Sequence, residues 1–405
     1  MTEKSAKPQL RFAGFDDTWE QRKLGEVCDS FEYGLNAAAK EFDGKNKYIR
    51  ITDIDDDSRV FLDSDLTSPD CDLCSAEKYK LQDGDIVFAR TGASVGKTFI
   101  YKALDGLVYY AGFLIRAKIN ENSYPDFVFY NTLTKKYERF IRITSQRSGQ
   151  PGVNAQEYSS FEFSLPSYEE QKKIGEYFRN LDNLITLHQR KYDKLTNVKK
   201  SMLEKMFPKN GSNVPEIRFK GFSDAWEQRK LGDIMNVTSV KRIHQSDWTD
   251  SGIRFLRARD IVSASKNEEP DDYLYISKEK YDEYSLVSGK VAIGDLLVTG
   301  VGTIGVPYLI RNSEPLYFKD GNIIWFQNGT KIDGDFFLYS FFGKAIQDFI
   351  NESAGIGTVG TYTIESGKKT PISLPEMKEQ QQIGVYFRNL DNLITLHQCE
   401  YIFEK

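Results

Sequence analysis

Residues 177–189 read YFRNLDNLITLHQ, and the same thirteen residues recur without a change at 386–398, an offset of 209. Apolar residues around both copies return at alternating steps of four and three, which is the heptad spacing of a coiled coil. Each copy lies inside a longer stretch of helical character, 167–208 in the first case and 376–405 in the second. Two helices separated by a folded domain pair most easily in opposite directions. The sequence therefore predicts an antiparallel helical pair.

The heptad spacing also predicts which side chains face the partner helix. They are Ile174, Phe178, Leu181, Ile185, His188 and Tyr192 in the first helix, and Ile383, Phe387, Leu390, Ile394, His397 and Tyr401 in the second. Polar residues on such a seam commonly set the register, which is the role we expect for the two histidines. An alternative stays open for the first turns, where Tyr177 and Leu184 widen the apolar face enough for each helix to pack on its own domain.

The ends of the two helices differ. Ser167 followed by Glu170 predicts a capping box at the start of the first helix. The repeat is lost from Cys399 onward. We therefore expect residues 195–206 of the first helix to lack an equal partner.

A second repeat opens each half of the chain. Residues 11–27 read RFAGFDDTWEQRKLGEV and residues 218–234 read RFKGFSDAWEQRKLGDI, so the 405 residues form two tandem copies. Mixed strand and helix patterns in each copy favour an α+β fold with pseudo-twofold tandem symmetry. The predicted parts are a first globular domain at 1–166, a first spacer helix at 167–208, a second globular domain at 209–375 and a short second spacer helix at 376–405.

Composition sets only broad limits. The formal net charge is −5, which neither indicates nor excludes nucleic-acid binding, because binding depends on where the basic groups lie. Four cysteines suggest no disulfide framework in a chain of this size. No signal peptide and no apolar run of membrane-spanning length is visible, so we expect a soluble cytoplasmic protein.

Two glycine-rich stretches resemble nucleotide-binding loops. Residues 92–98 (GASVGKT) have three residues between the glycines where a phosphate-binding loop has four, and residues 300–305 (GVGTIG) are followed by Pro307 and a β-rich run. Both fit a tight turn between two strands better. Such a turn exposes backbone N–H groups and hydroxyls that can approach a phosphate backbone.

Candidate catalytic and metal-binding groups are sparse. Cys71 and Cys74 form one C-x-x-C pair, and the three histidines, His188, His244 and His397, lie far from it in sequence. With two of those histidines on the predicted coiled coil, a Ser/His or Cys/His nucleophile has few candidates. We expect neither a catalytic set nor a metal site.

The duplicated layout and its motifs resemble those of a known protein family. A Leu-Pro pair followed by Glu-Gln, Ile and Leu-Asp begins at Leu165 and again at Leu374, and the RFxGF…WEQRKLG segments open each half. With these motifs the chain resembles the specificity subunit of Type I restriction–modification systems. The resemblance implies two target-recognition domains, each reading one half of a split double-stranded DNA target, held apart by two antiparallel helices.

The same resemblance implies partners and cofactors. Such subunits dock two methyltransferase subunits, which bring S-adenosylmethionine, and join restriction (translocase/nuclease) subunits that use ATP. This chain is then a non-catalytic reader that holds no cofactor itself. Two rival interpretations stay open: a protein-interaction scaffold with two β-rich modules on a helical rod, and an ATP-dependent enzyme built on residues 92–98.

For DNA contacts we favour basic or small polar residues at matched positions. Arg50 and Arg257 match within the runs YIRITDI and FLRARDI, and arginine can bind guanine through two hydrogen bonds. The predicted contacts are Arg50, Thr52, Arg90, Thr91, Ser94, Lys97, Arg147 and Gln150 in the first domain, and Lys241, Arg242, Arg257, Arg259, Thr299, Thr303 and Thr358 in the second.

Overall fold

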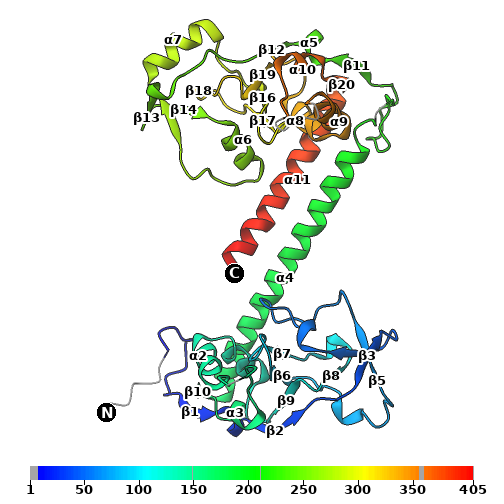
Figure 1. Cartoon of the computed structure of the whole chain (residues 1–405), viewed down its shortest axis with the longest axis vertical. Helices are drawn as coiled ribbons and strands as arrows, with labels where there is room; N and C mark the ends of the chain where they lie inside the picture. Colours follow the sequence, from blue (N-terminus) through cyan, green and yellow to red (C-terminus); the bar gives the residue numbers. More distant parts are fainter. Residues whose placement is uncertain (1–7, 148, 210, 355–359, 405) are drawn as a thin grey trace. The chain divides into compact units, whose positions relative to one another are not determined.

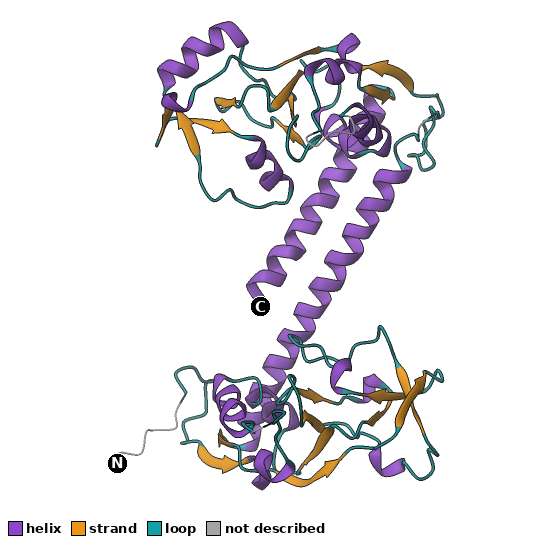
Figure 2. Ribbon diagram, viewed as in Figure 1, coloured by secondary structure: helices purple, strands orange, loops and turns teal. Residues whose placement is uncertain are grey.

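The computed structural model describes residues 8–147, 149–209, 211–354 and 360–404. The chain forms two compact units, residues 1–184 (unit 1) and 185–405 (unit 2). The long helix α4 (Tyr168–Lys205) begins in unit 1 and ends in unit 2, which also contains helix α11 (Met377–Glu404) (Figure 1). The mixed strand and helix content of both units is drawn in Figure 2.

Unit 1 is centred on a four-stranded antiparallel sheet with the order β2-β9-β6-β7. Strand β6 is buried along its whole length, because its alternate side chains enter two different cores. Ile86 and Phe88 join the core beneath helices α1 (Pro125–Asn131) and α2 (Lys135–Thr144). Val87 and Ala89 join the core beneath the parallel pair β4 (Asn46–Ile49) and β8 (Leu107–Tyr110). The strands are β1 (Glu20–Lys23), β2 (Cys28–Tyr33), β3 (Ala38–Glu41), β4 (Asn46–Ile49), β5 (Thr67–Asp70), β6 (Ile86–Ala89), β7 (Thr98–Ile100), β8 (Leu107–Tyr110), β9 (Leu114–Ile119) and β10 (Glu162–Leu165).

The helices of unit 1 follow the last strand of this sheet. Thr134 caps α2, since its hydroxyl accepts a hydrogen bond from the Tyr137 N–H. Asn154 and Glu157 form a capping box at α3. The helices are α1 (Pro125–Asn131), α2 (Lys135–Thr144) and α3 (Ala155–Ser159), with short 3-10 turns η1 (Leu24–Glu26), η2 (Ile51–Asp53), η3 (Glu77–Tyr79) and η4 (Ala103–Asp105).

Unit 2 repeats this plan. Its central antiparallel sheet has the order β12-β19-β16-β17, and a second sheet, β13-β15-β14-β18, contains the parallel pair β14 and β18. The strands are β11 (Glu227–Lys230), β12 (Asn236–Thr238), β13 (Trp248–Thr249), β14 (Ile253–Leu256), β15 (Leu274–Ile276), β16 (Leu296–Thr299), β17 (Pro307–Leu309), β18 (Leu316–Phe318), β19 (Ile323–Gln327) and β20 (Pro371–Leu374). The helices are α5 (Leu231–Ile234), α6 (Ala258–Ser265), α7 (Lys278–Ser288), α8 (Gly334–Phe342), α9 (Lys344–Ser353) and α10 (Ile364–Lys369), with a 3-10 turn η5 (Gln245–Asp247).

The two repeated sequence segments meet in the same way in each unit. The Arg11 guanidinium donates two hydrogen bonds, of 2.7 and 2.8 Å, to the fully buried Glu170 carboxylate, and Arg218 binds Glu379 at the same two distances. In the structure the Glu170 carboxylate, which the sequence assigned to a capping box with Ser167, is engaged by Arg11. Strand β1 also pairs with β10, and β11 with β20. Each opening segment is thus clamped to the first turn of the helix that follows its domain.

Within unit 2 the second half of α4 lies along α11 (Figure 1). The His188 and His397 Nδ1 atoms are 3.0 Å apart, and Lys199 Nζ lies 2.6 Å from Asp391 Oδ1. The Phe207 ring, just beyond α4, stacks on Phe387 at 5.9 Å. As the residue numbers increase along α4, those of the contacting residues on α11 decrease, so the two helices are antiparallel, as predicted.

The expectation that residues 195–206 lack an equal partner is wrong. In unit 2 these residues pack against the second domain and the start of α11, where Met202, Leu203 and Met206 contact the core that contains Phe387. The antiparallel direction explains the difference, because it brings the end of α4 to the beginning of α11 and not to its end.

The first turns of each helix pack on their own domain, which is the alternative that the sequence left open. Ile174 packs against the core of unit 1, and the Phe178 ring lies 5.2 Å from the Tyr130 ring of α1. Ile383 and Phe387 are buried in the core of unit 2. The Tyr401 side chain lies outside the described residues.

Candidate nucleic-acid interface

Each unit has an edge where three chain segments meet. In unit 1 the Ala111 N–H donates to the Ile49 carbonyl at 3.0 Å, and the Arg90 N–H donates to the Phe113 carbonyl at the same distance. These bonds join the end of β4, the β8–β9 turn and the loop after β6, and we call this place edge 1.

Unit 2 has the same two bonds at the corresponding place. The Lys319 N–H donates to the Leu256 carbonyl at 2.9 Å, and the Gly300 N–H donates to the Asn322 carbonyl at 2.7 Å. The end of β14, the β18–β19 turn and the loop after β16 therefore form edge 2. Edges 1 and 2 follow the same backbone path with different residues.

Arg50 and Arg257, which occupy matched positions, form ion pairs with aspartates of edges 1 and 2. Arg50 binds Asp53 through its main-chain N–H and its guanidinium, with distances of 2.9, 2.8 and 2.7 Å. Arg257 binds Asp260 in the same way and also binds Asp272 at 2.8 Å. The hydrogen bond from Arg257 lowers the pKa of Asp272 below its usual value. Both arginines were predicted to contact bases, and the structure instead places most of their donors on aspartates of the same edge.

The glycine-rich loops are strand connections, as predicted. The first joins β6 to β7 and the second joins β16 to β17, and each pair is antiparallel. Lys97 is buried, and its Nζ donates to the Ile54 carbonyl at 2.9 Å and pairs with Asp56 at 2.5 Å. Thr299 is fully buried, and its hydroxyl donates to the Thr303 carbonyl. The predicted DNA contacts at Lys97 and Thr299 are therefore corrected, because both side chains are buried: Lys97 binds the segment after η2, and Thr299 binds within its own loop.

Edge 2 is hollow and basic. A groove of about 570 Å³ beside the end of β14 is lined by Arg242, Ile243, His244, Gln245, Trp248, Arg257, Ala258, Arg259, Lys319 and Asn322. Arg242 and Arg259 have side chains that are 67 and 63 % exposed; Arg242 pairs with the largely buried Asp320, whereas Arg259 pairs with the exposed Asp272. Exposed ion pairs contribute about 0–1 kcal/mol. The Arg259 guanidinium can therefore exchange its carboxylate for a phosphate or a base at small cost.

Edge 1 presents aromatic surface at the corresponding place. Phe113, on the β8–β9 turn, is 62 % exposed. The Arg90 guanidinium carbon lies 5.0 Å from the centre of the half-exposed Tyr33 ring. Thr91 bridges to Gly152, beside the exposed Gln150. Aromatic faces stack on bases, and apolar side chains can wedge between them. The sequence did not single out Tyr33 or Phe113, since exposed aromatic residues have no periodic pattern.

The other predicted contacts are scattered around these edges. Thr52 and Thr303 are exposed, whereas Ser94 is half-buried. Arg147 pairs with Glu157, and Lys241 Nζ lies 4.1 Å from the centre of the Tyr284 ring. Thr358 lies outside the described residues.

Other kinds of site find little support in the described part of the chain. Among those residues no group of three or more His, Cys, Asp or Glu side chains could hold a metal ion. Burial raises the pKa of the Cys28 thiol to about 12, so it stays protonated at neutral pH. A hollow of about 230 Å³ near the end of α4 is smaller than the ~300–1,000 Å³ of usual small-molecule sites. No described helix is long and apolar enough to cross a membrane.

Comparison with known proteins agrees with this geometry. The family model described as "Type I restriction modification DNA specificity domain" matches residues 16–197 and 223–402. A putative Type I restriction enzyme MjaX specificity subunit from Methanocaldococcus jannaschii is 24 % identical over 95 % of this chain and 89 % of its own length. The MjaVIII specificity subunit of the same organism is 24 % identical over 79 % of this chain and 75 % of its own length.

A solved structure shares the fold. The crystal structure of a Type I restriction–modification system S subunit from M. genitalium aligns over 99 % of this chain and 95 % of its own chain, with a TM-score of 0.56 and 14 % identity. At this identity the likeness concerns the fold alone.

Proposed function

The chain belongs to the Type I restriction–modification DNA specificity family, and from that premise we propose how it selects its target. The two globular domains are its target-recognition domains, and each reads one half of a bipartite double-stranded DNA sequence. Edge 1 reads one half-site and edge 2 reads the other. The observation that carries this proposal is the matched pair of edges, equal in backbone path and unlike in side chains.

The unlike edges support an asymmetric target. A basic groove such as edge 2 suits phosphates and the acceptor atoms of guanine in the major groove. An exposed phenylalanine beside an arginine–tyrosine pair, as at edge 1, suits unstacked or deformed base steps. Two identical edges would be expected to read two identical half-sites, whereas these two are expected to read different ones.

The helices α4 and α11 are proposed to fix the spacing between the half-sites. Helix α4 runs without a break from unit 1 into unit 2, and α11 packs on its second half. Two domains on one face of B-DNA contact sites about one helical turn, ~34 Å, apart. A stiff connection makes the spacer length part of the specificity.

We propose that the chemistry lies in partner subunits. The relatives are named as specificity subunits of restriction enzymes, and this chain is proposed to be a reader without catalysis. Two methyltransferase subunits would supply S-adenosylmethionine and restriction subunits would use ATP. We propose that the chain itself holds no cofactor and that it acts in the cytoplasm.

A nuclease footprint of the chain in complex with its methyltransferase partner tests this function. The expected result is two protected segments with an unprotected or weakly protected spacer whose sequence does not matter. One contiguous protected segment, or equal protection of all sequences, would contradict it. A protein-interaction scaffold would give no footprint at all.

A further inference from the structure

Helix α2 of unit 1 presents a cationic face that its counterpart in unit 2 lacks. The buried side of the helix, with Tyr137 and Ile141, packs on the core of unit 1. The exposed side carries four cations, which we call the α2 face: Lys135, Lys136, Arg139 and Arg142. Within the residue ranges that the structure describes, none of these four side chains forms an ion pair or a hydrogen bond.

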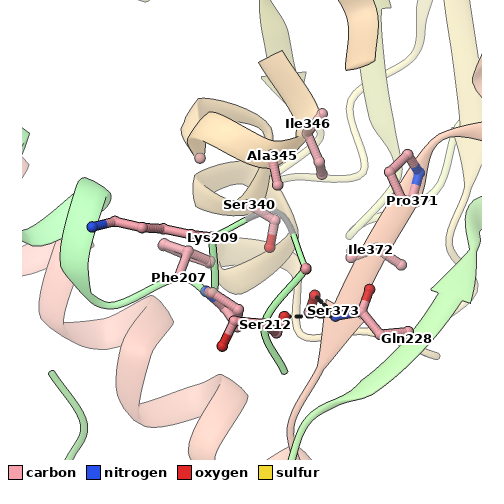
Figure 3. A pocket seen from close by; sticks show the side chains of 13 residues that line it. Phe207, Lys209, Ser212, Gln228, Ser340, Ala345, Ile346, Pro371, Ile372 and Ser373 are labelled. Atoms are coloured by element: carbon pink, nitrogen blue, oxygen red, sulfur yellow. Dashed lines mark hydrogen bonds between the residues drawn. The ribbon is translucent and has the colours of Figure 1, made fainter. Parts of the chain in front are cut away.

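The matching helix of unit 2 is α9, at an offset of 209 residues. Three of the four cations are replaced there, Lys136 by Ala345, Arg139 by Asp348 and Arg142 by Asn351. The fourth, Lys344, pairs with Asp348. Figure 3 shows Ala345 and Ile346, in the first turn of α9, beside the small hollow that Phe207 also lines. The same fold therefore forms this helix without the cations.

The cations of the α2 face do not stabilise the helix that carries them. Lys135 and Lys136 occupy its first turn, where the helix dipole disfavours positive charge. Arg139 lies three residues from both Lys136 and Arg142, a spacing at which like charges repel each other. An anionic partner explains these positive charges better than folding does.

The α2 face lies beside edge 1. The Tyr137 hydroxyl donates to the Gly96 carbonyl at 3.1 Å, so α2 packs on the loop after β6. The Ser145 carbonyl, just beyond the helix, accepts a hydrogen bond of 3.2 Å from the Gly152 N–H, and Gly152 bridges to Thr91 of the same loop. The cationic helix is therefore directly connected to the proposed recognition surface of unit 1.

Edge 1 itself has few cations that are available to phosphates. Arg50 and Arg147 pair with carboxylates of the same unit, and Lys97 is buried. Edge 2, in contrast, has Arg242 and Arg259 in its groove. Half or more of the hydrogen bonds in protein–DNA complexes go to phosphates and sugars, and these contacts position the protein on the duplex. Unit 1 therefore needs phosphate-binding groups outside edge 1.

We propose that the α2 face binds the phosphate backbone of the DNA that flanks the half-site read by edge 1. This inference rests on the proposed function, because it takes edge 1 as the surface that reads bases. The helix rises ~10 Å from Lys135 to Arg142. Each strand of B-DNA carries one phosphate per ~3.4 Å of its axis, so the face is long enough for about three phosphates.

An acidic protein surface fits the α2 face less well than DNA does. The centres of protein–protein interfaces are depleted in charged residues, lysine above all, and enriched in aromatic residues. The exposed large apolar residue of α2 is Ile143, in the last turn of the helix and away from the two lysines. The face thus offers charge without an apolar centre, which is the chemistry that suits phosphates.

Salt-dependent DNA binding tests the proposal, measured on the full chain in complex with the proposed methyltransferase subunits. We expect K136Q/R139Q/R142Q to bind the bipartite target and unrelated DNA about tenfold more weakly, with the ratio of the two affinities unchanged. The slope of log affinity against log salt should fall by about 0.9 for each lost phosphate contact. The matched control is R22Q/K23Q/K118Q, which removes three exposed cations on β1 and at the end of β9 far from edge 1, and it should change neither quantity.

Hydroxyl-radical footprinting locates the contact on the DNA. In K136Q/R139Q/R142Q, protection should be lost over about three nucleotides outside the half-site of edge 1, while both half-sites stay protected. Thermal unfolding of this variant should occur at an unchanged or higher temperature, because neighbouring like charges are removed. Weaker DNA binding then has no origin in misfolding.

Two results would overturn this inference and leave the proposed function standing. The first is a bipartite footprint with the affinity and salt slope of the unaltered chain in K136Q/R139Q/R142Q. The second is an unchanged salt slope together with weaker assembly with the methyltransferase subunits in sedimentation, which would make an acidic protein surface the partner. If the unaltered complex protected no DNA site, the proposed function would fail, and this inference with it.

Discussion

Edges 1 and 2 share a backbone path and differ in almost every exposed side chain. Edge 1 presents Phe113 and the Tyr33–Arg90 pair, whereas edge 2 presents Arg242 and Arg259 around a groove. Behind each edge the supporting contacts are alike, from the Arg-x-x-Asp pairs to the clamps between opening segment and helix. The difference shows that one set of residues stabilises the fold, and a separate, exposed set is available to contact DNA.

The separation has a physical reason. A buried ion pair such as Arg11–Glu170 is costly to alter, because removing one partner leaves a charge without its hydrogen bonds. An exposed arginine or phenylalanine can change with little effect on folding. Specificity can therefore vary at the edges while the clamps stay fixed.

The largest effect is expected from removing the cations of edge 2. The variant R242A/R259A/K319A should bind DNA about 100-fold more weakly, since each contact is worth about 1 kcal/mol or more. It should relax selectivity at one half-site only, which a binding selection from random DNA would show. The slope of log affinity against log salt should fall by about 0.9 for each lost phosphate contact.

The control for that variant removes equal charge elsewhere on unit 2. Lys278, Lys290 and Lys344 are exposed and lie outside the groove. Their replacement by alanine should change affinity slightly and selectivity not at all. Equal loss in both variants would mean that edge 2 has no special part in binding.

Breaking the clamps should affect stability and not selectivity. Glu170→Gln should destabilise unit 1 and Glu379→Gln should destabilise unit 2, each by about 1.5–3 kcal/mol, because both carboxylates are fully buried and accept two charged hydrogen bonds. Hydrogen exchange read by mass spectrometry assigns the loss to one unit. A loss shared equally by both units after either change would contradict the separate clamps.

Gly175 and Gly384, at matched positions in α4 and α11, test how closely each helix packs on its own domain. A Cβ atom on Gly175 would lie 3.0 Å from the Phe127 backbone nitrogen, and one on Gly384 would lie 2.9 Å from that of Phe336. Alanine favours helix by about 1 kcal/mol over glycine, but overpacking costs about 1–3 kcal/mol. Since backbone cannot yield easily, Gly175→Ala and Gly384→Ala should each lower the unfolding temperature of their own unit. A rise in both unfolding temperatures would show that the helix propensity of alanine outweighs the cost of overpacking.

The smallest effect is expected at edge 1. Phe113→Ala should leave stability unchanged, because the side chain is largely exposed, and should weaken DNA binding up to about tenfold by loss of one base contact. Leu104→Ala, at another exposed apolar residue of unit 1, is the control and should do neither. Unchanged DNA affinity and selectivity in Phe113→Ala would show that another surface of unit 1 contacts the first half-site.

Repetition made much of the fold predictable from sequence. The duplicated heptads gave the antiparallel pair, and the glycine loops between strand patterns gave the two hairpins. The pairing of Glu170 with Arg11, 159 residues away in sequence, was not predicted, because local patterns do not show such pairs. The expectation for residues 195–206 was wrong because the antiparallel direction brings them to the start of α11, where the repeat is intact.

The interface was less predictable than the fold. Arg242 and Arg259 were predicted as basic residues when the two copies were matched, and the structure brings them into one groove. The predicted DNA contacts at Lys97 and Thr299 were wrong because both side chains are buried, and burial depends on tertiary packing, which residue type does not reveal. Phe113 was missed because an aromatic residue in a strand-rich stretch is usually core.

The most direct test of two different recognition edges on one supporting fold is a map of the modified bases in cells that express this chain together with the proposed methyltransferase subunits. Sequencing should show a bipartite motif with two different half-sites, and in cells with R242A/R259A/K319A only one half-site should relax or be lost. A motif with identical halves, or a variant that alters both halves together, would contradict the account.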